Sequence, residues 1–179
     1  HPGLEVSLVE VTTTGDVDRT SPVATLTGVG AFVRAVQQAL RDGGADLAVH
    51  SCKDLPVHGP EGLAIVYPGR EAPWDVLCGA RLDELAIGAR VGTGSPRRSA
   101  QLALLRPDLD IAEIRGNVDT RLAKVTAEEY DAVVLAEAGL ARIGRLDAVA
   151  ERFRLEDMVP APAQAALAVE VAAGGPPER

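Results

Sequence analysis

Short strand patterns alternate with helix patterns along most of this chain, and this alternation restricts its fold more than any other feature. Strands are expected at residues 4–11, 46–50, 63–67, 75–78, 90–93, 109–114, 131–136 and 167–171. Helices are expected at 32–40, 96–105 and 118–125, with two short helical pieces around Leu140 and Val149, and a polar, glycine-containing loop at 12–30. Such alternation is typical of βαβ units, so we predict an α/β protein with mainly parallel sheets.

Two proline-rich breaks divide the pattern. The first runs from Pro68 to Pro73 and the second from Met158 to Pro162. Breaks of this kind often separate domains. We therefore predict one domain from residues 1–69 with 160–179 and another from 70–159, hinged over a cleft that closes on a ligand.

The composition excludes several classes of function. A net charge of -8 and a pI near 4.9 argue against a nucleic-acid or anionic-membrane partner held by the overall field. An aromatic content of 3% makes base stacking improbable. No apolar run is long enough to span a membrane and no signal peptide is evident, so a cytoplasmic location is expected. Cys52 and Cys78 are expected to be free thiols, and no metal site is predicted.

The first candidate site follows the expected strand at residues 46–50. Lys53 and Asp54 come after this strand, and the carboxyl ends of strands in open α/β sheets face the ligand crevice. The carboxylate of Asp54 could stabilise a cation or transfer a proton, or it could simply end a turn before Leu55. His50 and Ser51 suggest a hydrolase, but neighbours on a strand point to opposite faces and cannot pair.

The second candidate site is the segment from Thr93 to Arg98. Ser95 and Pro96 are typical of an N-cap and a first helical residue, so two guanidiniums are placed at a helix N-terminus, where anions bind. Arg115 and Arg121 flank the next expected strand-to-helix turn. Each alone could be a surface ion pair, but together the four arginines favour a polycarboxylate or phosphate ligand.

Four motifs, in order, then resemble one family closely. They are HSCKDLP at 50–56, GTGSPRR at 92–98, RGNVDTRL at 115–122 and AGLAR at 138–142. The family is hydroxymethylbilane synthase, also called porphobilinogen deaminase. The resemblance implies two periplasmic-binding-protein-like (type II) domains and a small third domain. It also implies a transferase of porphyrin and heme biosynthesis that joins four porphobilinogen molecules head to tail, with loss of ammonia, on a dipyrromethane cofactor.

The resemblance also assigns roles to individual residues. Asp54 would be the catalytic carboxylate that steadies the pyrrole nitrogens and the azafulvene cation formed on deamination. The acetate and propionate groups of the cofactor and of the growing polypyrrole intermediates would be held by Ser51, Lys53, Thr93, Ser95, Arg97, Arg98, Arg115, Arg121, Arg142 and Gln164. The protein would act as a monomer.

The sequence departs from the family pattern in some places. The family's N-terminal strand and helix, and the C-terminal domain whose cysteine carries the cofactor, are expected outside residues 1–179. Ala165 stands after Gln164 where the family has glycine. The alternative from another class is a non-catalytic anion-binding module of the periplasmic-binding type, or an inactive fragment.

Overall fold

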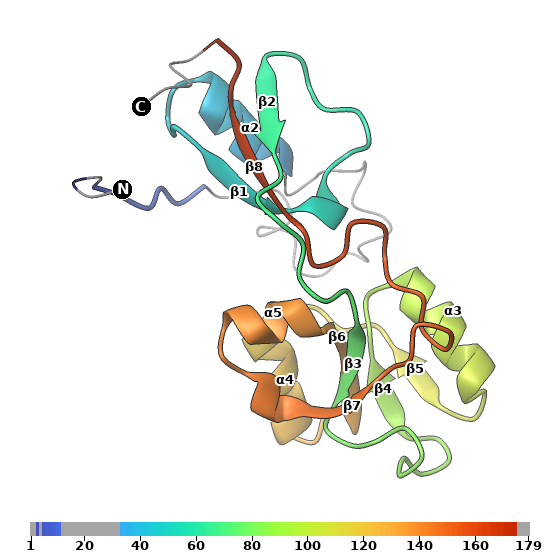
Figure 1. Cartoon of the computed structure of the whole chain (residues 1–179). Helices are drawn as coiled ribbons and strands as arrows, with labels where there is room; N and C mark the ends of the chain where they lie inside the picture. Colours follow the sequence, from blue (N-terminus) through green and yellow to red (C-terminus); the bar gives the residue numbers. More distant parts are fainter. Residues whose placement is uncertain (1–2, 4, 12–32, 175–179) are drawn as a thin grey trace. The chain divides into compact units, whose positions relative to one another are not determined.

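The structure, a computed structural model, describes residues 3, 5–11 and 33–174 (Figure 1). It divides into two compact units. The first unit contains the described residues up to Gly69 and those from Leu167 onward, and the second contains Arg70–Ala166. The chain thus returns to the first unit at Leu167, so residues 160–166 cluster with the second unit and not with the first, where the sequence placed them.

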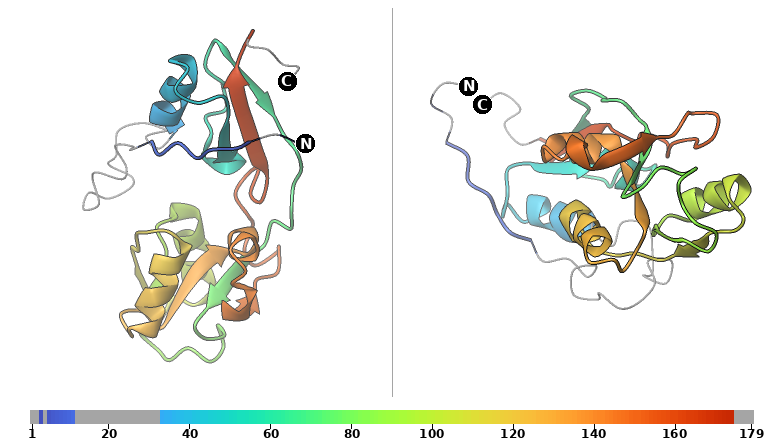
Figure 2. Two further views of the ribbon diagram at one scale, coloured as in Figure 1. Left: turned by 90° about the vertical axis from the view of Figure 1, so that its left-hand side faces the viewer. Right: turned by 90° about the horizontal axis from the view of Figure 1, so that it is seen from below.

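The first unit is a three-stranded sheet with one helix on it. The sheet order is β1-β8-β2, with β1 Ala48–Ser51, β2 Leu63–Val66 and β8 Leu167–Ala172. Both outer strands are antiparallel to β8. Helix α2, Val33–Arg41, packs on β1 and β8 (Figure 2). It ends at Arg41, just before the glycines that were predicted to stop it. Gly43 has a φ of 72°, and the N–H groups of Gly43 and Gly44 donate to carbonyls of the last helical turn.

The strand predicted at residues 4–11 does not form in the part of it that the structure describes. Residues 5–11 pair with no strand, and Val6 and Leu8 are 77% and 98% exposed. Alternation specifies a two-faced segment, but a strand also needs a backbone partner that alternation cannot specify. The loop predicted at 12–30 and Phe32 lie outside the described residues.

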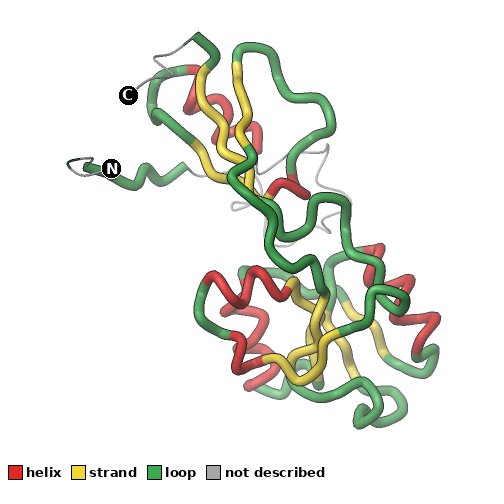
Figure 3. The backbone as a smooth tube through the Cα atoms, viewed as in Figure 1, coloured by secondary structure: helices red, strands yellow, loops and turns green. Residues whose placement is uncertain are grey.

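The second unit is a five-stranded sheet with helices on both faces. Its strands, in the order β5-β4-β6-β3-β7, are β3 Asp75–Cys78, β4 Arg90–Gly92, β5 Asp110–Ala112, β6 Ala132–Ala136 and β7 Val149–Arg152. Its helices are α3 Pro96–Leu105, α4 Val118–Thr126, α5 Glu137–Arg142 and the 3-10 turn η3 Leu146–Ala148 (Figure 3). Leu102 of α3 joins the core on one face, and Leu122 of α4 and Leu140 of α5 join the core on the other. None of the helices in the described ranges is long and apolar enough to cross a membrane.

The expectation of mainly parallel sheets is wrong for the described strands. Only β4 pairs in parallel, with β5 and β6, whereas β3 is antiparallel to β6 and β7. The physical reason is that β3 follows the connection from the first unit without a crossover helix, so nothing forces it to be parallel. The helical piece expected around Val149 is likewise strand β7.

Candidate functional site

The reversed direction of β3 creates the centre of the second unit's site. Asp75, its first residue, pairs with Ala136, the last residue of β6, so it lies at the edge of the sheet where β6 ends. Strand β4 is parallel to β6, and the loop from β4 to α3 therefore leaves the sheet at this same edge. A buried carboxylate thus lies where the strand-end motifs emerge.

Arg98 binds this carboxylate most closely. Its Nε and Nη2 donate to Oδ1 of Asp75 at 3.0 and 2.5 Å, and its Nη1 donates to the carbonyl of Val134 at 3.0 Å. Arg98 and Asp75 are only 6% and 1% exposed. Burial lowers the pKa of Arg98, and the charge of Asp75 opposes this effect. All three of these side-chain hydrogen bonds hold the Arg98 guanidinium to the sheet.

Arg97 and Gln164 also contact the carboxylate of Asp75. Arg97 Nη2 lies 2.8 Å from Oδ2 of Asp75, an ion-pair contact without hydrogen-bond alignment, and its Nη1 donates to the carbonyl of Val159. Gln164 is fully buried, and its Nε2 donates to Oδ1 of Asp75 at 2.9 Å and to the carbonyl of Pro73 at 2.6 Å. The Arg97 side chain is 26% exposed and the Arg98 side chain 7%, so Arg97 is the more accessible of the two.

The start of α3 forms as the sequence predicts. Ser95 is the N-cap, its hydroxyl accepts from the backbone N–H of Arg98 at 3.4 Å, and Pro96 is the first helical residue. Thr93 is 3% exposed, and its Oγ1 accepts from the N–H of Ser95 at 3.2 Å. These hydroxyls fix the loop that carries Arg97, and the helix N-terminus adds its own attraction for anions.

The remaining predicted arginines have different surroundings. Arg121 Nε donates to the carbonyl of Gly116 at 2.8 Å, and its pKa is lowered, first by burial and then by the charge of Arg98. Arg115 Nε lies 3.6 Å from a carboxylate oxygen of Glu113. Arg142 binds Glu71 at 3.1 Å and the carbonyl of Ala165, the residue after Gln164, at 2.8 Å. The structure thus brings Arg97, Arg98 and Gln164 together on Asp75, places Arg121 within the field of Arg98, and joins Arg142 to the segment of Gln164.

The charges of Arg97, Arg98 and Arg121 outnumber the charge of Asp75, and this cluster therefore favours the binding of an anion. Two guanidiniums share the single carboxylate of Asp75, and the third, on Arg121, is close enough to be affected by Arg98. The local excess of positive charge contrasts with the chain's net charge of -8. Guanidiniums bind carboxylates through paired hydrogen bonds, so the cluster can bind a ligand that carries acidic groups.

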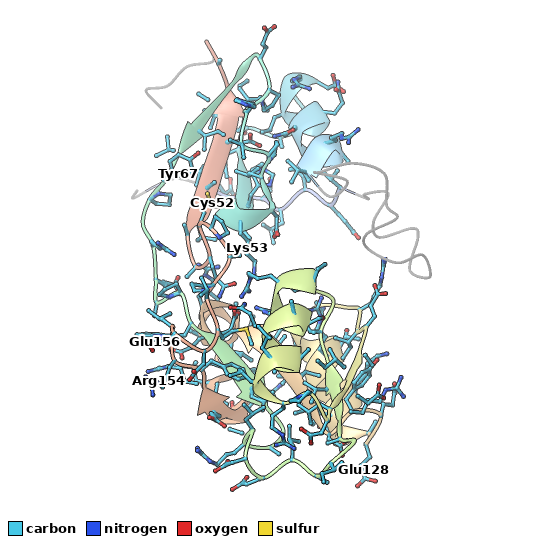
Figure 4. All side chains as sticks on the ribbon, turned by 90° about the vertical axis from the view of Figure 1, so that its right-hand side faces the viewer. Cys52, Lys53, Tyr67, Glu128, Arg154 and Glu156 are labelled. Atoms are coloured by element: carbon cyan, nitrogen blue, oxygen red, sulfur yellow. The ribbon has the colours of Figure 1, made fainter. Side chains whose placement is uncertain are left out.

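The first unit carries the other predicted site residues. Ser51 is the last residue of β1, and Cys52–Asp54 form a short 3-10 helix, η2, closed by the N–H of Leu55 on the carbonyl of Cys52. Figure 4 labels Cys52 and Lys53 on this turn. Lys53 and Asp54 are exposed. Desolvation raises the pKa of Asp54, and the charges of Lys53 and, more weakly, His50 act in the opposite direction.

The first unit also contains a buried polar cluster of Gln37, His50 and Glu170, of which His50 precedes this turn by two residues. Glu170 of β8 is 0% exposed, and both its carboxylate oxygens accept from Nε2 of Gln37, at 2.9 and 3.1 Å. His50 Nε2 lies 2.9 Å from Oε2 of Glu170, close enough for an ion pair although not aligned as a hydrogen bond. Three elements, α2, β1 and β8, each contribute one member.

Sequence reasoning missed Asp75, Glu170 and Gln37. A signal for the two acids was present, because Asp75 begins the otherwise apolar strand DVLC at 75–78 and Glu170 interrupts the apolar strand LAVEVA at 167–172. A carboxylate in a buried strand must have partners. Gln37 gave no such signal, because a glutamine in an amphipathic helix is usually exposed.

Comparison with known proteins identifies the fold class and then the family. The fold is that of periplasmic-binding-protein-like (type II) domains. Among solved structures, a prephenate dehydratase from Arthrobacter aurescens in complex with L-Phe has a TM-score of 0.51 and 16% identity, over 82% of this chain and 52% of that one. The family described as "Porphobilinogen deaminase, dipyromethane cofactor binding domain" matches residues 1–176. The chain belongs to the porphobilinogen deaminase family, as its motifs predicted.

Several relatives named porphobilinogen deaminase are similar over nearly the whole chain. The protein of Leifsonia xyli is 54% identical over 96% of this chain, and that of Thermobifida fusca is 51% identical over 94%. In Nitratidesulfovibrio vulgaris a relative is 49% identical over 95% of the chain. The match covers 53%, 53% and 56% of these relatives, so the chain spans about half their length.

Proposed function

We propose that the complete protein containing this chain is a hydroxymethylbilane synthase, a transferase that joins four porphobilinogen molecules and releases ammonia. The observation that carries this proposal is the excess of positive charge around Asp75 at the strand ends of an acidic protein. Porphobilinogen and the polypyrroles made from it carry carboxylates on every ring. A site for such ligands needs several arginines, and this chain concentrates them at the motifs of the family.

Asp54 is the proposed catalytic carboxylate. Deamination of porphobilinogen leaves positive charge on the pyrrole unit, and a nearby carboxylate stabilises this charge only if it is ionised. Desolvation raises the pKa of Asp54, whereas Lys53 and His50 lower it and so favour the ionised form. The side chains of Ser51 and Lys53, beside Asp54, are proposed to hold acidic groups of the ligand.

The residues of the second unit suit a dipyrromethane cofactor, a group with several carboxylates. Arg97 is the more accessible of the two guanidiniums on Asp75, and Arg98, Arg121 and the N-terminus of α3 add positive potential. We propose that these groups, together with Thr93, Ser95, Arg115, Arg142 and Gln164, bind or orient the acidic side chains of the cofactor and of the polypyrrole. When bound, the cofactor supplies the primer to which the first porphobilinogen is joined.

The test uses the complete protein and porphobilinogen. We expect turnover to uroporphyrin-forming product, and a coloured adduct of the purified protein with Ehrlich's reagent, because a bound dipyrromethane reacts. Asp54→Ala should reduce kcat by at least about 100-fold, the usual scale for a charge-stabilising group, while the Ehrlich colour is largely retained.

A matched control is Asp46→Ala, which removes an exposed aspartate from the same unit. It should leave turnover unchanged. Normal turnover by Asp54→Ala would refute the catalytic role. A protein that neither consumes porphobilinogen nor gives the Ehrlich colour would instead favour the anion-binding module, since a sensor of this fold needs no pyrrole.

Two further properties belong to this proposal. We propose that the protein acts in the cytoplasm, where a small soluble precursor such as porphobilinogen would be available. We also propose that it is a monomer, because each predicted ligand-binding residue comes from the one chain. Size-exclusion chromatography with light scattering would test the second point, and a dimer that dissociates only with loss of activity would contradict it.

A further inference from the structure

We infer that Gln101 is a positioning residue for Arg97 and acts through the backbone of Val159. This inference deepens the proposed function and rests on it, because Arg97 is a guanidinium proposed to bind acidic groups of the ligand. All the contacts that support it lie within the second unit. They connect helix α3 with the segment that follows β7.

The first step is that the Arg97 guanidinium contacts two acceptors, one through each terminal nitrogen. Its Nη2 lies 2.8 Å from Oδ2 of Asp75, and its Nη1 donates to the carbonyl of Val159. Oδ2 of Asp75 accepts no aligned hydrogen bond from the described residues, whereas Oδ1 accepts from Arg98 and Gln164. Hydrogen bonds are directional, so the Val159 carbonyl orients the guanidinium while Asp75 supplies the opposite charge.

The second step is that the Val159 carbonyl itself must be fixed. Val159 lies outside the helices and strands and is 58% exposed, so neither regular backbone pairing nor burial holds it. The next residue, Pro160, has no N–H to donate. The preceding residue, Met158, is 1% exposed and belongs to the core, so the segment is anchored just before this carbonyl. The direction of the carbonyl therefore depends on its hydrogen bonds.

The third step is that Gln101 supplies hydrogen bonds to this backbone. Its Oε1 accepts from the N–H of Val159 at 2.7 Å, and its Nε2 donates to the carbonyl of Val159 at 3.2 Å. The side-chain amide thus pairs with both backbone groups of one residue, as a neighbouring strand would. Its Nε2 also lies 3.4 Å from the sulfur of Met158. Gln101 therefore fixes the peptide groups around Val159 relative to α3.

The spacing along α3 brings Gln101 and Arg97 together. The two residues are four apart in the helix, so they lie on the same face of it. The Nε2 of Gln101 also donates to the carbonyl of Arg97 at 3.2 Å. Both residues are partly buried. One face of α3 therefore carries the guanidinium and the amide that fixes its acceptor.

The experiment compares Gln101→Met with wild type in the complete protein. Methionine has a similar length and suits a helix, but it cannot replace the hydrogen bonds of the amide. The guanidinium NMR signal of Arg97, assigned by its loss in Arg97→Ala, should shift and exchange faster with water because its acceptor is no longer fixed. We also expect kcat/KM for porphobilinogen to fall about two- to tenfold, the usual effect of one neutral hydrogen bond.

The matched control is Ser99→Ala in the same helix. The Ser99 hydroxyl donates to the carbonyl of Ser95, four residues back, as Gln101 does to the carbonyl of Arg97. This variant removes a comparable side-chain hydrogen bond without touching Val159. It should change neither the Arg97 signal nor kcat/KM.

A double substitution separates positioning from a merely structural role. If Gln101 acts through Arg97, adding Gln101→Met to Arg97→Ala should lower kcat/KM no further. An equal fall in both backgrounds would overturn the inference, because a structural link between α3 and Val159 would matter with or without the guanidinium.

The outcomes also separate this inference from the proposed function. An unchanged Arg97 signal in folded Gln101→Met would overturn the inference, and so would a changed signal with unchanged kcat/KM. A wild-type protein without turnover would overturn the proposed function, while the NMR comparison would still decide whether Gln101 positions Arg97. If Gln101→Met does not fold, Gln101→Asn, whose amide is one methylene shorter, must change the same signal for the inference to stand.

Discussion

Replacing Asp75 by asparagine should destabilise the second unit more than any exposed charge change. The substitution keeps the shape but removes the charge that Arg97 and Arg98 share. An asparagine side chain also has only one acceptor oxygen, so its amide nitrogen would face a guanidinium or the amide of Gln164, and two donors would oppose each other. The guanidinium of Arg98, 7% exposed, would be left without its counter-charge.

The magnitude follows from this burial. Breaking a buried ion pair by removing one partner costs about 3–5 kcal/mol, because an uncompensated charge remains in the interior. Arg97 is 26% exposed and can turn toward water, so we expect the lower end, about 3 kcal/mol. The free energy of unfolding would be measured by urea denaturation, following the fluorescence of Trp74, the neighbour of Asp75.

The control for this prediction is Asp83→Asn. Asp83 forms an ion pair with Arg81, but its side chain is 75% exposed, and such surface pairs contribute little. The urea midpoint of this variant should stay close to that of wild type. If Asp75→Asn were within about 1 kcal/mol of wild type, with an unchanged dependence on urea, the buried carboxylate would not hold the arginines as argued.

Two further predictions concern stability. Ala165 has a φ of 71°, a left-handed conformation that costs an alanine about 1 kcal/mol more than a glycine, so Ala165→Gly should raise the free energy of unfolding by about that amount. Ala166→Gly, at a position without positive φ, should lower it, and a less stable Ala165→Gly would contradict the argument. Burial raises the pKa of the Cys78 thiol from 9.0 to about 11, so the unfolded chain releases this proton first and stability should fall as pH rises from about 9 through about 11. Urea denaturation across this range would show the fall, and Cys78→Ala should reduce it.

Most elements of the fold could be predicted from the sequence because each has a local signal. The helix at 96–105 has its serine cap and proline start, α2 has its glycine end, and the apolar run at 131–136 is a buried strand. Strand direction could not be predicted in this way. Hydrophobic periodicity is the same for a parallel and an antiparallel strand, so the reversal of β3 and the missing partner of residues 5–11 depend on long-range contacts that no local pattern records.

The candidate site could be predicted only in part, for a related reason. Motifs along the chain pointed to Lys53 and Asp54 in the turn η2 and to Arg97 and Arg98 in the first turn of α3, where local sequence is informative. They did not reveal Asp75, which is 23 residues away from Arg98 in sequence and meets it only because β3 is reversed. Partners that come together through sheet order have no fixed spacing in sequence.

The two carboxylates that the sequence motifs did not reveal, Asp75 and Glu170, occupy similar positions in the two units. Asp75 is on β3 and Glu170 is on β8, and each of these strands runs antiparallel to its neighbours within its own unit. Asp75 binds the arginines of the motif that follows β4, and Glu170 contacts the histidine of the motif that ends β1. In each unit, therefore, a buried acid on the reversed strand fixes a basic group from a strand-end motif. If this common arrangement is what orients the motifs, Asp75→Asn should weaken cofactor retention, measured as Ehrlich colour, whereas Asp83→Asn, an exposed charge change in the same unit, should leave the colour intact.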